Sequence, residues 1–165
     1  MKWITHQATA VAAALTLHLP AGGLLAVCAG AVLPDVLDQR MAGLAGSARG
    51  RQQAFNRIHR GTTHWFGWWA AVFAGALLLP LTPAARAAAT GLGFGGLSHV
   101  ILDMLTPQGV PLQPFSRTCR FSFNLCSTGS FGEYCFLAGV VAATWFFLGT
   151  DVLRVVRRLG QGVFF

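Results

Sequence analysis

The chain has 165 residues, of which 54% are hydrophobic and 10% are charged, whereas about a quarter of the residues in ordinary soluble domains are charged. This length suits one domain, and the composition argues against a soluble protein and predicts a membrane protein. Twelve basic residues stand against five acidic ones, an excess that in membrane proteins reflects topology and contact with anionic headgroups. No nucleic-acid-binding module is recognisable, so we expect membrane lipid rather than nucleic acid as the partner.

The first apolar stretch, residues 7–33, is interrupted by "HLPAGG" at 18–23. Proline and glycine favour a turn there, so we expect a short helical hairpin with two helices of about 12 residues, each roughly 18 Å long. Such helices are too short to cross a hydrocarbon core about 30 Å thick. The hairpin would therefore place residue 6 and residue 35 on the same side of the membrane.

Three longer apolar segments follow a polar basic one. We expect a basic loop over residues 39–60 and transmembrane helices over residues 64–81, 87–105 and 131–149. Residues 106–130 form the loop before the last span, and "CRFSFNLC" at 119–126 is compatible with a short strand or a β-hairpin. The expected fold class is an all-α membrane protein: one polytopic domain over residues 1–165, with the N-terminal hairpin and about three transmembrane helices.

The four cysteines do not predict a thiolate metal site, because no CxxC pair occurs. Cys119 and Cys126 flank the predicted hairpin and would form a disulfide only in an oxidising compartment. The sequence leaves that pairing open.

The basic residues divide unevenly between the two sides of this topology. One side carries eight: Lys2, Arg40, Arg49, Arg51, Arg57, Arg60, Arg117 and Arg120. The other carries four: Arg86, Arg154, Arg157 and Arg158. The positive-inside rule predicts that the first side faces the cytoplasm, and the C-terminal "RVVRR" is the exception to it.

Nearly all potential carboxylate and imidazole ligands fall on the side with eight basic residues. The ten candidates are Asp35, Asp38, Asp103, Glu133, Asp151, His6, His18, His59, His64 and His99. Every one except Asp151 and His18 lies at or near the end of a predicted span on that side. Ionisable groups at membrane depth cost roughly 2.5–3.5 kcal/mol each, so they are retained when paired or functional. Their convergence predicts a metal site.

Each candidate also has a structural interpretation when it is taken alone. His99 and Asp103 are spaced i and i+4, so they share a helix face and can bind one metal or simply hydrogen-bond to each other. The acids of "LPDVLD" at 33–38 can be solvated groups at a helix start, and Glu133 can be a first-turn acid that favours the helix dipole. His59 and His64 in "HRGTTH" can be loop histidines.

Mixed histidine and carboxylate ligation without thiolates favours zinc, or manganese as the second choice, with one or two ions. Such an ion activates water and polarises a phosphoryl or carbonyl oxygen. Arg60, beside His59, is placed to neutralise an anionic substrate. Arg117 and Arg120 can do the same or contact lipid headgroups.

Four motifs resemble, in order, those of the YdjM-like family: "LPDVLD", "HRGTTH", "GGLSHVILDMLTPQGVPL" and "STGSFGE", at 33–38, 59–64, 95–112 and 127–133. The resemblance runs from about His6 to Glu133. That family comprises bacterial inner-membrane proteins described as metal-dependent hydrolases. The metal ligands that the resemblance implies are His6, Asp35, His64, His99, Asp103 and Glu133, with His59 and Arg60 nearby.

The chain departs from that family at one corner. The family commonly has Asp-x-Asp-His after the proline, whereas Leu37 replaces the second acid here and Asp38 stands in the place of the histidine. A site for two metals then depends on whether Asp38 compensates. The order of ligands also resembles that of zinc-dependent phospholipase C, which points towards phosphoesters.

The sequence therefore suggests a metal-dependent hydrolase in the inner membrane, with its site facing the cytoplasm. Its substrate would be a phospholipid or lipid-linked phosphoester, attacked by metal-activated water, with Arg60, His59 and Glu133 assisting catalysis. The alternative is a non-catalytic membrane protein whose metal is structural or whose residues bind a partner. An open metal position would favour the first and a closed sphere of four ligands the second.

Overall fold

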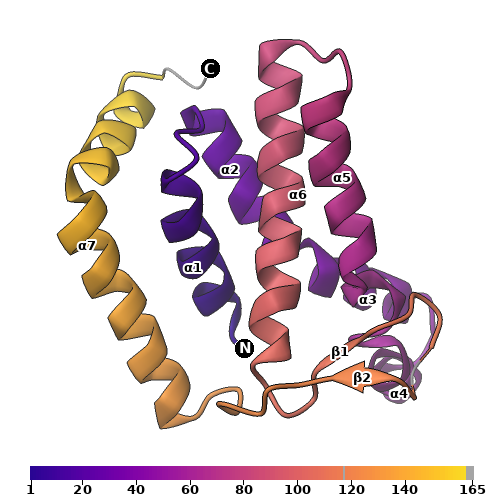
Figure 1. The fold of residues 1–165 in the computed structure, drawn as a ribbon. Coiled ribbons are helices and arrows are strands. Elements are labelled where there is room, and N and C mark those ends of the chain that lie inside the picture. Colours follow the sequence, from indigo (N-terminus) through magenta and orange to yellow (C-terminus); the bar gives the residue numbers. More distant parts are fainter. Residues whose placement is uncertain (117, 163–165) are drawn as a thin grey trace.

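The computed structural model describes residues 1–116 and 118–162, so Arg117 lies outside the described residues. Within that part the chain forms seven α-helices, one 3-10 turn and two very short strands (Figure 1). The elements are α1 Trp3–Leu15, α2 Ala21–Gly30, α3 Leu33–Gly43, α4 Ala48–Ile58, η1 Thr62–His64, α5 Phe66–Leu78, α6 Pro83–Met104, β1 Val110–Pro111, β2 Arg120–Phe121 and α7 Phe131–Gly160. The all-α class predicted from the sequence is confirmed.

The N-terminal hairpin forms as expected. Helices α1 and α2 have 13 and 10 residues, about 20 and 15 Å at 1.5 Å per residue. The turn between them uses His18 at a φ of 50° and Pro20 as the N-cap of α2. Helix α3 follows α2 after a bend of 47°, which returns the chain to the end of the bundle where α1 begins.

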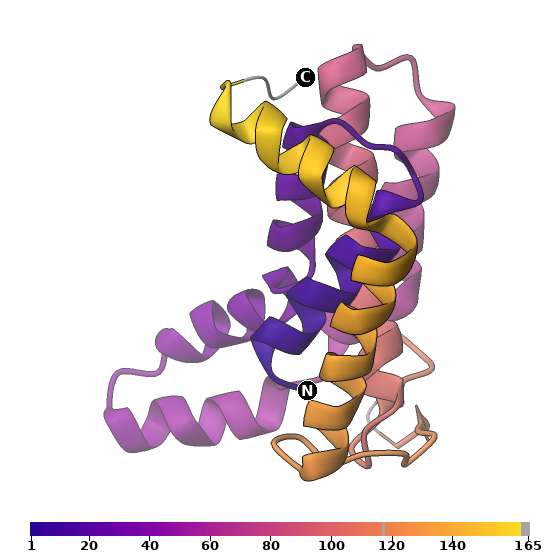
Figure 2. The same ribbon diagram turned by 90° about the vertical axis from the view of Figure 1, so that its left-hand side faces the viewer.

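The basic segment 39–60 is mostly helical, where the sequence suggested a loop. Helix α3 continues to Gly43 and α4 covers Ala48–Ile58. Ser47 caps α4 by accepting a hydrogen bond from the backbone N–H of Gly50, and arginine, glutamine and alanine inside α4 are good helix formers. In Figure 2 these two helices project together from the lower part of the bundle.

Fewer helices than expected meet both the length and the apolarity needed to cross a membrane. Among the described residues α7 meets both, and the bent pair α2–α3 adds a second span if it is counted as one. Helix α5 is apolar but has 13 residues, about 20 Å. Helix α6 has 22 residues, but its glycines, His99 and Asp103 reduce its mean hydropathy. The prediction of about three full spans is thus corrected to one or two.

Helix α6 is the centre of the bundle and packs on α2 and α5 through small residues. A Cβ atom on Gly95 would lie 2.2 Å from the carbonyl oxygen of Val27, and one on Gly91 would lie 2.2 Å from that of Gly23. Only glycine allows two helix backbones to approach so closely. This glycine seam (Gly91 and Gly95 of α6 against Gly23 and Val27 of α2) fixes the height of α2 relative to the functional end of α6.

The loop before α7 contains a short hairpin, as the sequence suggested, but only β2 lies within the segment 119–126 and its partner β1 lies upstream of it. Strands β1 and β2 pair antiparallel, with Val110 opposite Phe121. Cys119 and Cys126 are free cysteines in the structure. Helix α7 then runs to Gly160, beyond the expected end at 149, and is bent at Leu148, whose φ and ψ of −127° and 15° are not helical.

Candidate metal centre

Six imidazole and carboxylate side chains from four elements meet at the end of the bundle that contains the N-terminus in Figure 1. They are His6 of α1, Asp35 and Asp38 of α3, His64 of η1, and His99 and Asp103 of α6. All six are buried, at 8% exposure or less. Folding thus brings five of the predicted metal ligands together with Asp38, although they lie far apart in the sequence.

The centre of this cluster is a triangle of ligand atoms. Nε2 of His64 lies 3.2 Å from Nε2 of His99 and 3.3 Å from Oδ1 of Asp35, and the third side, from His99 to Asp35, is 3.7 Å. Ligands of a tetrahedral zinc ion at 2.0–2.1 Å lie about 3.3 Å apart. Oδ2 of Asp103 is a neighbouring oxygen, 3.6 Å from both nitrogens. We refer to Asp35, His64 and His99 as the central triad.

In each of the two central histidines, the Nδ1 atom, which lies away from the triad, has a hydrogen-bond partner of its own. Nδ1 of His99 lies 2.7 Å from the carbonyl oxygen of Ala31, at the C-terminal end of α2. Because a carbonyl can only accept, this nitrogen carries the proton. Nδ1 of His64 lies 3.0 Å from the hydroxyl of Thr63, whose own proton goes to Asp38, so this nitrogen is a donor too. Such outer contacts orient metal-binding histidines.

These partners leave two nitrogen lone pairs facing each other across 3.2 Å. In the neutral imidazole the nitrogen opposite the N–H is an acceptor, and burial lowers the pKa of His64, which favours this neutral form. Oδ1 of Asp35 adds a third acceptor, because it is buried and has no hydrogen-bond partner among the described residues. Three converging acceptors without a donor are costly unless a cation lies between them. The donor set therefore fits a divalent metal.

Two further groups adjoin the central triad. On one side, Nε2 of His6 lies 3.5 Å from Oδ1 of Asp103, and its ring stacks on that of His99. On the other side, Nδ1 of His59 lies 3.3 Å from Oδ2 of Asp38. The His6 and His59 groups both satisfy the spacing of potential metal ligands.

Asp38 is better placed to orient His64 than to bind a second ion. Its Oδ2 lies 3.5 Å from Nδ1 of His64, the nitrogen that already donates a proton. Asp38 also accepts hydrogen bonds from the hydroxyl of Thr63 and the backbone N–H of Arg60. A carboxylate behind a histidine ligand raises its basicity and fixes its ring.

Arg60 supplies the positive charge of the cluster. Its guanidinium donates to Oδ1 of Asp103 at 2.8 Å and to the hydroxyl of Thr106, and the residue is 5% exposed. The amino group of Met1 also lies 3.2 Å from Asp103. His59, by contrast, keeps a quarter of its side chain exposed and stands at the outer edge of the site.

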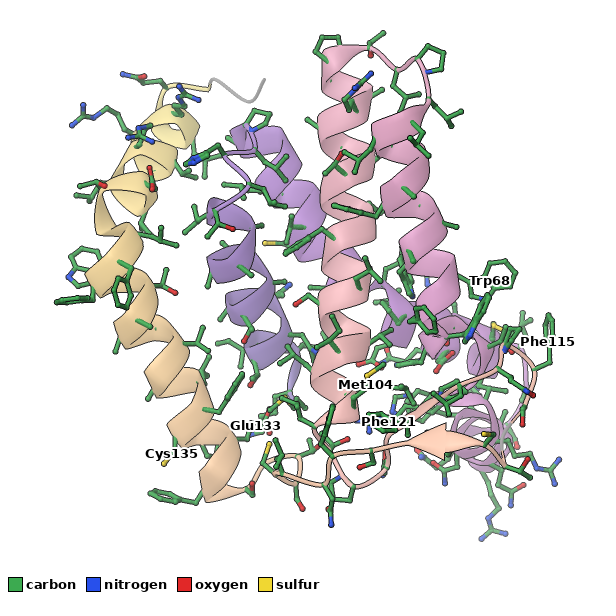
Figure 3. The ribbon with its side chains drawn as sticks, viewed as in Figure 1. Trp68, Met104, Phe115, Phe121, Glu133 and Cys135 are labelled. Carbon is green, nitrogen blue, oxygen red and sulfur yellow. The ribbon has the colours of Figure 1, made fainter. Side chains whose placement is uncertain are left out.

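Glu133 is not brought into any group of potential ligands among the described residues. Its carboxylate accepts hydrogen bonds from the backbone N–H groups of Lys2 and Gly129 and from the hydroxyl of Thr5. In Figure 3 it lies on the side of α7 that faces the bundle, whereas Cys135 points away. We therefore assign Glu133 to a structural role, which joins the start of α7 to the start of α1.

The structure adds residues that the sequence did not identify. Asp38 was named as a candidate but not as a site residue, although it lies one turn after Asp35 on the same helix. Trp3, whose indole N–H donates to Oδ2 of Asp35 at 2.8 Å, and Thr63 were not singled out. Thr63 is next to His64 in the sequence and Trp3 lies three residues before His6, but no spacing rule predicts such outer contacts.

Comparison with known proteins identifies the family of the chain. No curated protein and no solved structure matches the chain. The model of the family described as "YdjM inner membrane protein" matches residues 1–158, which include every element of the site. The chain therefore belongs to the YdjM family of inner membrane proteins.

Proposed function

We propose that this protein is a metal-dependent hydrolase of the inner membrane, acting on a phospholipid or a lipid-linked phosphoester. One observation carries the proposal: the Nε2 atoms of His64 and His99 face each other across 3.2 Å, beside a buried oxygen of Asp35 that has no hydrogen-bond partner among the described residues. Folding brings such acceptors together without a donor at a considerable cost. A bound cation offsets this cost.

The central triad would hold the ion. Three nitrogen and oxygen ligands match the set that catalytic zinc sites use, with a further position left for water or substrate, and manganese is the second choice. When bound, a divalent ion would polarise a phosphoryl oxygen and activate water for attack. Asp103 is close enough to the two nitrogens to hold a proton or to complete the ligand set.

A cavity adjoins the site at Asp38, beside the projecting helices. It has a volume of about 350 Å³ and shares Asp38 with the site, and its lining includes Met41, Ile58, Thr62, Thr63 and Phe115. Apolar side chains and hydroxyls thus line the same space. This mixture supports an amphiphilic substrate, whose polar head would lie near Asp38 and whose apolar part would contact Met41, Ile58 and Phe115.

Arg60 and His59 would assist in different ways. Because its guanidinium is held by Asp103 and Thr106, Arg60 would position Asp103 and add a fixed positive charge near an anionic substrate. His59 lies at the exposed edge of the site, 3.6 Å from Oδ1 of Asp35. Its side chain is a quarter exposed, so His59 would contact a substrate where the site meets solvent.

The site would face the cytoplasm. The helices that carry Asp35, Asp38 and His59 also carry Arg40, Arg49, Arg51 and Arg57, and basic residues next to spans favour the cytoplasmic side. The same arginines would attract the anionic headgroups of that leaflet.

The test is hydrolysis by protein reconstituted into vesicles with zinc or manganese, assayed on a panel of phospholipids and lipid-linked phosphates. We expect metal-dependent product release that falls at least about 100-fold in His64→Gln, while His18→Gln, which changes an exposed histidine outside the site, stays within about twofold. Metal-loaded protein that hydrolyses nothing in this panel would contradict the proposal.

A further inference from the structure

The end of the bundle opposite the metal centre contains the C-terminal arginines that the positive-inside rule does not explain. There the bend at Leu148 turns the last part of α7 over the ends of α1 and α2, as Figure 2 shows. Leu148, Val152 and Val155 pack against the apolar core that α1 and α2 share. Arg154 and Arg158 thereby lie beside the α1–α2 turn and line one cavity with it, although their side chains remain exposed.

A charged cavity opens at this place. It has a volume of about 170 Å³. Its polar lining is Asp151, Arg154 and Arg158 of α7 with His18 of the α1–α2 turn, and its apolar lining is Leu15, Leu19, Ala21 and Val155. Arg154 forms an ion pair with Asp151. Two guanidinium groups against one carboxylate give the lining a positive balance, and planar guanidinium groups bind phosphate oxygens in pairs.

An apolar cavity adjoins the charged one. It has a volume of about 200 Å³ and shares Leu15, Ala21 and Val155 with it, while its other lining residues are apolar or cysteine. A third cavity, of about 330 Å³, continues from Leu15 along the middle of α7 past Val152 and Trp145. The three cavities share lining residues and follow the seam between α7 and the hairpin, from a charged opening to an apolar groove whose lining includes the exposed Trp145.

We propose that this seam binds one anionic phospholipid, with its phosphate at Arg154 and Arg158 and its acyl chains in the two apolar cavities. The charged cavity alone would suit any small phosphate, and the apolar ones alone would suit any lipid. Because the charged and apolar cavities share lining residues, together they fit a molecule that has both a phosphate group and acyl chains. The excess of arginine over acid favours an anionic headgroup over a zwitterionic one.

This site also accounts for the exception in the charge distribution. Arginines that bind a lipid in the opposite leaflet are retained for that contact, so they need not report topology. The lipid would fill the seam along which α7 leaves the bundle, because α7 is otherwise largely exposed. The inference is independent of the hydrolase proposal, since it uses residues at the other end of the molecule.

The test is lipid binding to delipidated protein in a neutral detergent, measured by native mass spectrometry with phosphatidylglycerol and phosphatidylcholine of matched chains. We expect phosphatidylglycerol to bind at least about tenfold more tightly. Arg158→Gln should remove most of that preference. Arg157→Gln is the matched control, because Arg157 is the adjacent arginine but does not line the cavity. Equal effects of the two substitutions, or equal binding of the two lipids, would overturn the proposal.

Two further measurements test the acyl chains. Millimolar glycerol phosphate should not displace the lipid, and displacement would show that the site binds soluble phosphate instead. Cys28→Phe places a larger side chain in the apolar cavity and should weaken phosphatidylglycerol binding several-fold, with helicity by circular dichroism confirming that the variant folds. Unchanged affinity in a folded variant would contradict the placement of the chains.

Discussion

The two ends of this bundle treat charge in opposite ways. At the metal centre, His64, His99 and Asp103 are at most 1% exposed, and each is held by partners from other elements. At the opposite end the side chain of Arg154 is 57% exposed and its partner Asp151 lies one turn away on the same helix. Burying a polar group without a partner costs free energy. At the metal centre a bound cation would offset that cost, whereas the exposed groups at the opposite end have little such cost to offset. The second end can attract an anion at its surface with little prior cost.

The largest stability effect should come from Arg60, which balances the buried carboxylates. Arg60→Met removes the guanidinium and leaves Asp103 and Thr106 without this donor. Breaking a buried ion pair costs about 3–5 kcal/mol, to be measured as the free energy of unfolding in detergent. The exposed Arg57 lies on α4 nearby, and Arg57→Met should change that energy by less than about 0.5 kcal/mol. If Arg60→Met and Arg57→Met lowered the free energy of unfolding equally, the buried ion pair of Arg60 would not have the stabilising role described here.

A second effect should follow from the glycine seam. Gly95→Val would push the new side chain into the carbonyl of Val27 and separate α2 from α6, at a cost of about 3 kcal/mol. Because α2 also presents Ala31 to His99, metal affinity should fall as well. Gly139 of α7 has open space around it, so Gly139→Val is the control and should cost less than about 1 kcal/mol. If Gly95→Val kept its metal affinity, packing at the glycine seam would not be needed to position the metal ligands.

A smaller effect should separate Glu133 from the metal. Glu133→Gln replaces one accepting oxygen with a donor in front of backbone N–H groups, which should lower the free energy of unfolding by about 1–2 kcal/mol and leave the metal content unchanged. Asp151→Asn, on the same helix at the other end, should cost less than about 1 kcal/mol, because it breaks an exposed pair. If Glu133→Gln lost its metal, Glu133 would have to be counted among the metal ligands.

The sequence predicted the position of the site better than its internal contacts. Alternation of short and long apolar segments was enough to bring His6, Asp35, His64 and His99 to one end, because each lies near the end of a segment. The length of the spans was harder to predict. The glycines of α6 allow it to pack closely inside the bundle, but they also reduce its mean hydropathy. The apolar segment 87–105 therefore suggested a full span, although the helix that it forms is not apolar enough to meet that test.

The roles of individual residues depended on partners that no local pattern reveals. His99 takes its orientation from a carbonyl 68 residues away, and Glu133 is saturated by donors from the other end of the chain. The basic segment 39–60 was expected to be a loop because of its polarity, although its residues have good helix propensity and Ser47 is a capping residue. The polarity of segment 39–60 correctly indicated that it is exposed to solvent. An exposed segment can still be helical, which is why the loop prediction was wrong.

The most direct measurement is the metal content of purified protein by mass spectrometry of the elements, comparing the wild type with His99→Gln and His18→Gln. The two variants carry the same substitution, one in the central triad and one at an exposed position. We expect about one zinc ion per chain in the wild type and in His18→Gln, and below about a tenth of that in His99→Gln. Full metal content in folded His99→Gln would contradict the account.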